Sequence, residues 1–488
     1  MASADVPKVE YHITASKRND KVKVISDIKS GMNESAERLS RWRKAHIGDT
    51  SFMFIVVTVV GIFSGACAYL LKHAVAWVSR MLTSGLSAAG GNWILLVIPL
   101  AGIVLTGLVT RYVMRMNLSD GVRMLRQQLR RHDYRISPAR ISYPLLASTI
   151  TLGFGGSAGG GGAEPGAGAA IGGNMGRWLG LPPHMVMIMI GCGAGAGIAG
   201  IFKSPLGGAL FTLEVMRLPM TTVPVLALLV CTLAAGMTAY ALGGFTLDLS
   251  MGDASAAFDI SMLPFIIALG LVCGGYSLYY SYIMKAVGAK LKSVKRPLLR
   301  NIAGGAMLGL AVFLFPSLYG EGYGVIGHVL NGNLEAVMSY GPFAGSGSGV
   351  WAIAALAAGT VVLKCFATSA TNNGGGVSGN FAPTLFAGCM LGLLFVYVVK
   401  GLWHVDLPVG FFALMGMSGV MAGVIRAPLM ALMLAVEMVG AYSSFFPLAV
   451  VAALSFGIVR LFTSDDYYSG RLDRPNGLMS KIVNNKHL

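Results

Sequence analysis

Long apolar runs separated by short polar loops dominate this chain of 488 residues. We expect membrane segments near 52–73, 93–113, 143–158, 183–200, 204–217, 222–243, 261–285, 300–316, 349–367, 382–402, 409–422, 428–440 and 444–463. Several runs are shorter than the roughly 20 residues that a helix needs to cross a bilayer. Such short, glycine-interrupted helices are tolerated at membrane depth only where other protein covers them or where they line a cavity. The pattern therefore predicts an all-α polytopic membrane protein with broken helices that meet inside the membrane.

The composition excludes most soluble functions. Hydrophobic residues make up 55% of the chain and charged residues only 12%, about half the usual charged share of a soluble domain. The six cysteines lie in apolar stretches without a CxxC pair. They are typical of small buried side chains and not of a disulfide framework or a zinc site. We expect no enzymatic activity and no cofactor.

The net charge of +16 lies mainly in the N-terminal tail and in the segments 111–140 and 285–300. Because these basic residues sit in the N-terminal tail and a few short loops, we expect no nucleic-acid partner. The loop at 246–260 carries acidic residues and no basic ones. Cytoplasmic loops of membrane proteins are enriched in Lys and Arg. The charge pattern therefore predicts that the basic loops and both termini face the cytoplasm.

An internal repeat joins two segments that lie 223 residues apart, GAGAGIAGIFKSPLGGALFTLEVM at 193–216 and GMSGVMAGVIRAPLMALMLAVEM at 416–438. Glycines, a basic residue, a Pro-Leu pair and a glutamate stay in register, so Glu214 pairs with Glu437. Membrane proteins that are built from internal repeats usually place their substrate site where the repeats meet. The predicted organisation is a cytoplasmic tail at 1–48, a first membrane repeat at 49–255, a second at 256–470 and a short cytoplasmic tail at 471–488, with no soluble regulatory domain.

Two glycine-rich stretches are the candidate substrate site. The first, at 153–176, cannot be an ordinary helix, because each interior glycine costs roughly 1 kcal/mol relative to alanine. We expect a loop that runs into a helix near Ala167, with backbone N–H groups that favour anions. The second stretch, at 371–386, has Pro383 in the first turn of the next helix. Two such helix ends at one centre would bind an anion without a fixed full charge.

Three motifs make the chain similar to the CLC family of chloride channels and chloride/proton exchangers, in its bacterial form without CBS domains. They are GNFAP at 379–383, GIFKSPLGGALFTLEV at 200–215 and SLYGEGY at 317–323. The resemblance implies a CLC-type fold of two inverted-topology helical repeats with tilted helices. It also implies a homodimer in the lipid bilayer with one anion pathway per subunit and bound chloride. The corresponding location is the bacterial inner (plasma) membrane, in which the protein would be integral.

The resemblance also implies a set of anion ligands. Asn380 and Phe381 would offer backbone N–H groups to the central anion. Tyr468, in DDYYS, matches the family's pore tyrosine, whose hydroxyl contacts the same ion. Ser119, in LSDGV, falls where the family has a pore serine, although the glycine and proline pattern around it is lost.

The gate of the family is a glutamate in GREGP, and here the stretch reads GGAEPG. With a short gap, Glu164 takes the gate position; without a gap, Gly161 takes it instead. We favour Glu164, because an ionisable residue in an intramembrane glycine loop is costly and is a functional candidate by default. A water-exposed carboxylate in the vestibule is the other interpretation of Glu164.

Exchangers of the family relay protons through an internal glutamate, and Val215 occupies that position here. Valine cannot carry a proton, which favours a channel-like or weakly proton-coupled pathway for chloride or similar anions. A chloride/proton antiporter that uses Glu164 with another proton route stays open. A polytopic enzyme or a cation-coupled transporter would need clustered intramembrane acidic or histidine residues. The sequence offers no such cluster, so these two classes are disfavoured. Glu214 is expected to cap or brace helix ends, and Lys364 either attracts anions or extends to an interface.

Overall fold

The computed structural model describes residues 48–84, 93–116, 118, 121–218, 221–247, 249–251, 258–339 and 349–463. Within these ranges the regular elements are helices, and nine of them are long and apolar enough to cross a membrane. The predicted cytoplasmic tails fall almost entirely outside these ranges. The all-α polytopic membrane fold is therefore confirmed.

The helices of the first half are α2 (Asp49–Thr83), α3 (Ile94–Leu108), η1 (Val109–Met114), α4 (Gly121–Arg130), α5 (Ala139–Gly153), η2 (Gly160–Gly162), α6 (Glu164–Trp178), α7 (Pro183–Phe202), α8 (Pro205–Leu210), η3 (Phe211–Val215) and α9 (Thr222–Gly243). Those of the second half are η4 (Ile260–Met262), α10 (Leu263–Ser293), α11 (Pro297–Leu314), η5 (Pro316–Leu318), α12 (Tyr323–Leu330), α13 (Leu334–Ser339), α14 (Val350–Gly374), α15 (Phe381–Trp403), α16 (Val409–Ile425), α17 (Pro428–Val439), η6 (Tyr442–Ser444) and α18 (Phe445–Phe462). The division at residue 255 stays a prediction.

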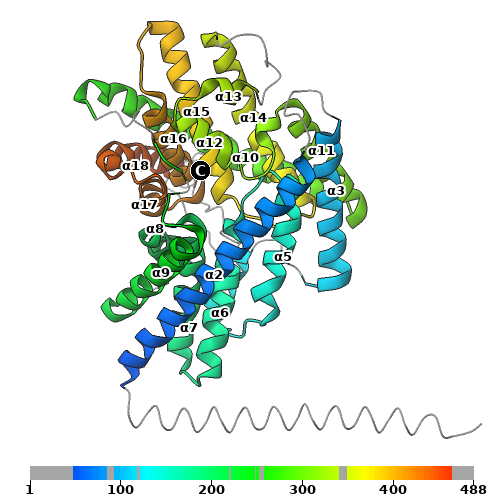
Figure 1. Ribbon diagram of the computed structural model, residues 1–488, viewed down its shortest axis with the longest axis vertical. Helices are drawn as coiled ribbons and strands as arrows, with labels where there is room; N and C mark the ends of the chain where they lie inside the picture. Colours follow the sequence, from blue (N-terminus) through cyan, green and yellow to red (C-terminus); the bar gives the residue numbers. More distant parts are fainter. Residues whose placement is uncertain are drawn as a thin grey trace, which may run out of the picture.

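The two halves pack their helices in the same pattern. In the first half α7 contacts α2, α6, α8 and α9, and in the second half α16 contacts α10, α15, α17 and α18. In Figure 1, α2 runs diagonally across the molecule, with α6 and α7 near its lower end, while α15, α16 and α18 lie in the upper part. Each half therefore builds a bundle around one buried, glycine-rich helix, α7 or α16.

The halves meet through equivalent elements. Helix α3 packs on α11 and α8 packs on α17. Between them, Gly159 and Gly379 form an antiparallel bridge, in which each N–H donates to the other carbonyl at 3.1 and 2.6 Å. Contact between equivalent elements is what a two-fold axis between inverted repeats produces. The glycine-rich segments identified in the sequence thus form a bridge between the halves.

Helix α6 begins at Glu164, three residues before the start expected near Ala167, and the predicted loop precedes it. A Cβ on Gly168 would lie 2.0 Å from the carbonyl oxygen of Gly193 on α7, and a Cβ on Gly388 would lie 2.2 Å from that of Gly416. The helix pairs α6–α7 and α15–α16 therefore approach to backbone contact. Close packing of this kind is what small residues allow between membrane helices, and it offsets the helix-propensity cost of glycine.

Helix α4 occupies part of the segment 111–140 that the sequence presented as a basic loop. Its apolar side chains, including Val122 and Leu125, are buried, while Gln127 and Arg130 are exposed. The hydropathy pattern missed this helix because arginines and glutamines make up half of it, although one of its faces is apolar. Helices α12 and α13 were missed because they are only eight and six residues long.

Reciprocal carboxylates cap the helices at the axis. Glu437, near the end of α17, accepts hydrogen bonds from the hydroxyl of Ser204 at 2.5 Å and from the N–H groups of Leu206 at 3.2 Å and Gly207 at 3.0 Å. Glu214 accepts from the first-turn N–H groups of α17, those of residues 429 and 430, at 3.2 and 2.8 Å. Each carboxylate satisfies orphan donors at the start of the other half's helix. The bracing role expected for Glu214 is therefore found.

Candidate functional site

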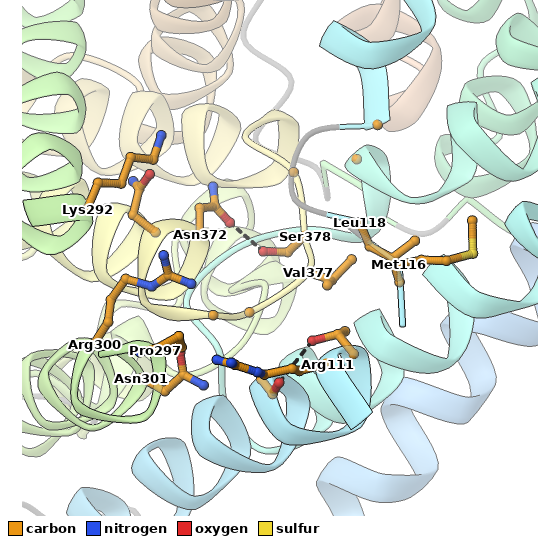
Figure 2. A pocket seen from close by; sticks show the side chains of 18 of the residues that line it. Arg111, Met116, Leu118, Lys292, Pro297, Arg300, Asn301, Asn372, Val377 and Ser378 are labelled. Carbon is orange, nitrogen blue, oxygen red and sulfur yellow. Dashed lines mark hydrogen bonds between the residues drawn. The ribbon is translucent and has the colours of Figure 1, made fainter. Parts of the chain in front are cut away.

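A basic cavity of about 540 Å³ lies among helices of both halves (Figure 2). It is bounded by the end of α3 with η1, the start of α4, the end of α10, the start of α11 and the glycine turn at 375–380. Four of its described lining residues are basic and none is acidic; the basic residues are Arg111, Arg115, Lys292 and Arg300. Walls that carry one sign of charge raise the local concentration of counter-ions. We call this space the basic vestibule.

The inner wall of the basic vestibule is the start of α15. Asn380 is the N-cap residue and Phe381 the first helical residue, and both are buried. The Asn380 side-chain oxygen accepts a hydrogen bond from Asn372 at 2.8 Å, and Asn372 accepts one from Ser378 at 2.6 Å. These side-chain bonds fix the turn that precedes the helix. The first-turn N–H groups of a helix have no intrahelical acceptor, so the turn presents a helix N-terminus beside the vestibule.

Gly161 faces this helix start from the first half. A Cβ on Gly161 would lie 3.2 Å from the Cβ and Cδ2 of Phe381 and 3.3 Å from Phe202. Phe381 is held in turn by an edge contact with Phe211, with ring centroids 5.7 Å apart. Gly161 and Phe381 are 220 residues apart, as are Gly159 and Gly379 of the bridge. By the internal symmetry, Gly161 is therefore the counterpart of Phe381.

A second cavity, of about 570 Å³, lies toward the other end of α3, among α2, α5 and the segment 316–325. Its lining includes Leu95 of α3, whereas Gly107 of α3 lines the basic vestibule. At 1.5 Å per residue, these two positions are about 18 Å apart along the helix. The second cavity is also lined by Lys72, Tyr319 and Glu321. We call it the far vestibule.

One short glycine turn is in contact with both vestibules. Gly162 lines the basic vestibule. Two residues earlier, the N–H of Gly160 donates to the Oε1 of Glu321 at 2.8 Å, and Glu321 lines the far vestibule. The segment Gly160–Gly162 therefore reaches the basic vestibule at Gly162 and is joined to the far vestibule through Glu321 at Gly160.

Lys364 lies fully buried near this turn. Its ammonium donates to the hydroxyl of Ser157 at 2.9 Å and lies 4.5 Å from the centre of the Phe386 ring. Its charge also acts on the carboxylate of Glu321. Of the two roles expected for Lys364, extension to an interface is wrong, because none of its side chain reaches the surface.

Glu164 is the first residue of α6 and is fully buried. Both of its carboxylate oxygens lack a hydrogen-bond partner among the described residues. Its electrostatic neighbours include Cys67 and Glu321, and it does not line the basic vestibule. The exposed vestibule carboxylate weighed for Glu164 is therefore wrong, and its gating role stays a prediction.

The remaining predicted site residues divide into two groups. Val215 packs in the apolar core at 4% exposure. Ser119 and Tyr468 lie outside the described residues. Sequence reasoning missed Ser157 and Glu321, although Glu321 stands in the quoted SLYGEGY motif as an acidic residue between two glycines. No cluster of His, Cys, Asp or Glu in the described part of the chain could hold a metal ion.

Comparisons with known proteins identify the family. The family model described as voltage gated chloride channel matches residues 102–460. A ClcB-like chloride channel protein of Ralstonia nicotianae is 28% identical over 389 residues, which cover 78% of this chain and 86% of the relative. The H⁺/Cl⁻ exchange transporter ClcA of Vibrio cholerae is 27% identical over 295 residues, 59% of each chain. This chain thus spans less than two thirds of that exchanger.

Solved structures share the fold. A slow cyanobacterial Cl⁻/H⁺ antiporter superposes with a TM-score of 0.69 at 20% identity, over 85% of this chain and 96% of that one. A CLC-type fluoride/proton antiporter gives 0.67 at 21% identity, over 83% and 95%. With the family match across most of the chain and two inverted helical repeats that meet at a glycine turn, the protein belongs to the CLC family of voltage-gated chloride channels and is an integral membrane protein that transports anions.

Proposed function

We propose that this protein conducts chloride or a similar small anion passively, from one vestibule to the other past the turn Gly160–Gly162. The supporting observation is that this turn lines the basic cavity at Gly162 and is hydrogen-bonded at Gly160 to Glu321, which lines the second cavity. Backbone N–H groups at the starts of η2 and α15 would replace part of the anion's hydration shell. Dipoles of this kind hold an anion weakly enough to release it.

A channel-like mechanism fits the residues at the expected proton position. Val215 is buried in apolar surroundings, and the neighbouring Glu214 already accepts two backbone hydrogen bonds from α17. Neither residue provides a free carboxylate for a proton relay. Gly161 opposite Phe381 adds no side chain that could close the pathway.

The decisive experiment uses purified protein in liposomes with an outward chloride gradient, recording chloride efflux and external pH together. Chloride efflux without proton movement is expected. Proton influx proportional to chloride efflux, or uphill chloride movement driven by a pH gradient, would refute passive conduction. Val215→Glu is the informative variant, because it adds a carboxylate at the expected relay position; Leu213→Glu, two residues earlier, is its control.

Proton-coupled exchange is the second candidate, and one observation favours it. Glu164 is a fully buried carboxyl group without a hydrogen-bond partner among the described residues, and such a group is costly unless it has a role. If Glu164 carries the coupled proton or gates the anion, Glu164→Gln will make anion flux faster and less dependent on pH. If both flux and pH response match the wild type, Glu164 has no part in gating.

The assembly and orientation follow as further proposals. We propose a homodimer in a bacterial inner membrane, with the basic vestibule toward the cytoplasm. The basic segments at the end of α10 and around η1 line that vestibule, and basic loops favour the cytoplasmic side. Labelling of a single cysteine introduced at Lys292 with an impermeant reagent tests the orientation, because only one side of a sealed vesicle is accessible.

A further inference from the structure

The carboxylate of Glu321 occupies a place suited to an anion. It reaches the glycine turn from the segment between η5 and α12 and accepts the Gly160 N–H at 2.8 Å. Charge from Lys364 and from Lys72 acts on it favourably. A backbone N–H together with a buried ammonium is a typical anion-binding pair. Glu321 therefore fills an anion-binding position with a tethered anion.

This position lies on the anion route proposed above. Gly160 carries the N–H donor, and its neighbours Gly161 and Gly162 continue the turn to the basic vestibule, which Gly162 lines. Glu321 itself lines the far vestibule. An anion that passes the turn therefore meets the Glu321 carboxylate before it reaches the far vestibule.

A free anion can replace the carboxylate without changing the charge balance at this place. The Lys364 ammonium is fully buried and needs a negative partner, because an uncompensated buried charge is strongly destabilising. A permeating anion that takes the place of Glu321 keeps that charge compensated. Lys72, which also lines the far vestibule, offers the displaced carboxylate a second positive partner, whereas Glu164 is the acidic group that repels it.

We propose that Glu321 is the side chain that closes the anion pathway: its carboxylate blocks the far side of the glycine turn by occupying an anion site, and a permeating anion must displace it. The proposal rests on the anion pathway proposed above and assigns its gate to a segment outside the glycine turn. Gly161 then needs no side chain, because the closing carboxylate comes from the α11–α12 connection.

The test compares Glu321→Gln with the wild type in two assays, chloride efflux from liposomes and chloride binding by calorimetry in detergent. Glu335→Gln, an exposed glutamate on α13, is the matched control. We expect Glu321→Gln to tighten chloride binding and to raise flux by about tenfold each, the effect of removing one charge-assisted hydrogen bond from the competing carboxylate. Glu321→Asp keeps the charge but shortens the side chain, so it should also raise flux.

The outcomes separate this proposal from the proposed function. Flux and binding equal to those of the Glu335→Gln control would overturn the role of Glu321 while leaving anion conduction intact. A lower melting temperature with unchanged chloride affinity would assign Glu321 a structural role and equally overturn the proposal. If the wild type and both Glu321 variants carry no anion, passive conduction fails. In that case tighter chloride binding by Glu321→Gln still supports occupancy of the site, and unchanged binding refutes it.

Discussion

The cap formed by Glu437 allows a quantitative prediction. In Glu437→Gln the side-chain volume is kept, but the charge is lost and one acceptor oxygen becomes an NH₂ group. The carboxylate accepts three hydrogen bonds, from Ser204, Leu206 and Gly207 at 2.5, 3.2 and 3.0 Å. The amide oxygen can keep the first and third bonds, which share Oε2, while the NH₂ group faces the N–H of Leu206.

The cost follows from these three bonds. Loss of the acceptor for one buried donor costs about 1–3 kcal/mol, and hydrogen bonds to a neutral acceptor are roughly half as strong as charge-assisted ones. The favourable interaction with the start of α8 adds about 0.5 kcal/mol. Relief of a buried charge offsets part of this sum. We expect a net loss of about 2 kcal/mol.

Thermal unfolding in detergent, followed by tryptophan fluorescence, measures this loss as a fall of several degrees in apparent melting temperature. Glu214→Gln is the internal comparison, since Glu214 accepts only two backbone hydrogen bonds and is half-buried. Its loss should be about half as large. Equal melting temperatures for Glu437→Gln and the wild type, or a larger loss at Glu214, would refute the cap as a stabilising contact.

Three further predictions follow from the geometry. Gly388→Ala should prevent stable folding, because its Cβ would lie 2.2 Å from a backbone oxygen. Its control is Gly275→Ala, where a Cβ would meet no atom of a neighbouring element within 4 Å and should stabilise the helix by about 0.5–1 kcal/mol. Equal expression and equal melting temperatures of the two variants would contradict the packing argument. The double variant Arg111→Gln/Arg300→Gln should reduce chloride flux more in assays at about 10 mM salt than at about 500 mM salt, because salt screens the charge of the basic vestibule. A reduction that is independent of salt would count against electrostatic attraction of the anion. Gly161→Glu should reduce anion flux by about tenfold and make the flux pH-dependent, because it adds a titratable carboxylate to the turn. The new Cβ would lie 3.2 Å from Phe381, which a small shift of the ring can accommodate. Flux equal to that of the wild type would exclude this turn from the pathway.

Sequence reasoning was most accurate where apolar runs are long. The segments expected at 183–200 and 222–243 correspond to α7 (Pro183–Phe202) and α9 (Thr222–Gly243). The start of α6 was placed three residues too late, because glycine propensities describe helices in water and not helices packed to backbone contact. Glu321 was missed for a different reason: its partner Gly160 lies 161 residues away in the chain, and no local pattern reports such a pairing.

The choice between Glu164 and Gly161 illustrates the same limit. The repeat offset is 223 residues at Glu214 and Glu437 but 220 at the bridge of Gly159 with Gly379. The segment from Gly379 to Glu437 is therefore three residues longer than the equivalent segment from Gly159 to Glu214. A glycine run offers no side chains that fix such a shift, so only the spatial pairing with Phe381 identifies the counterpart position.

The reciprocal caps also bear on how the chain is inserted during synthesis. Ser204 and the start of α8 leave the ribosome 233 residues before Glu437. At roughly 5–20 residues per second, the interval lasts on the order of ten to fifty seconds. Throughout it, the donors at the start of α8 must be satisfied by water or by the insertion machinery. A chain whose synthesis stalls before residue 437 therefore presents an uncapped helix end in the membrane, a feature by which quality control could distinguish unfinished copies from complete ones.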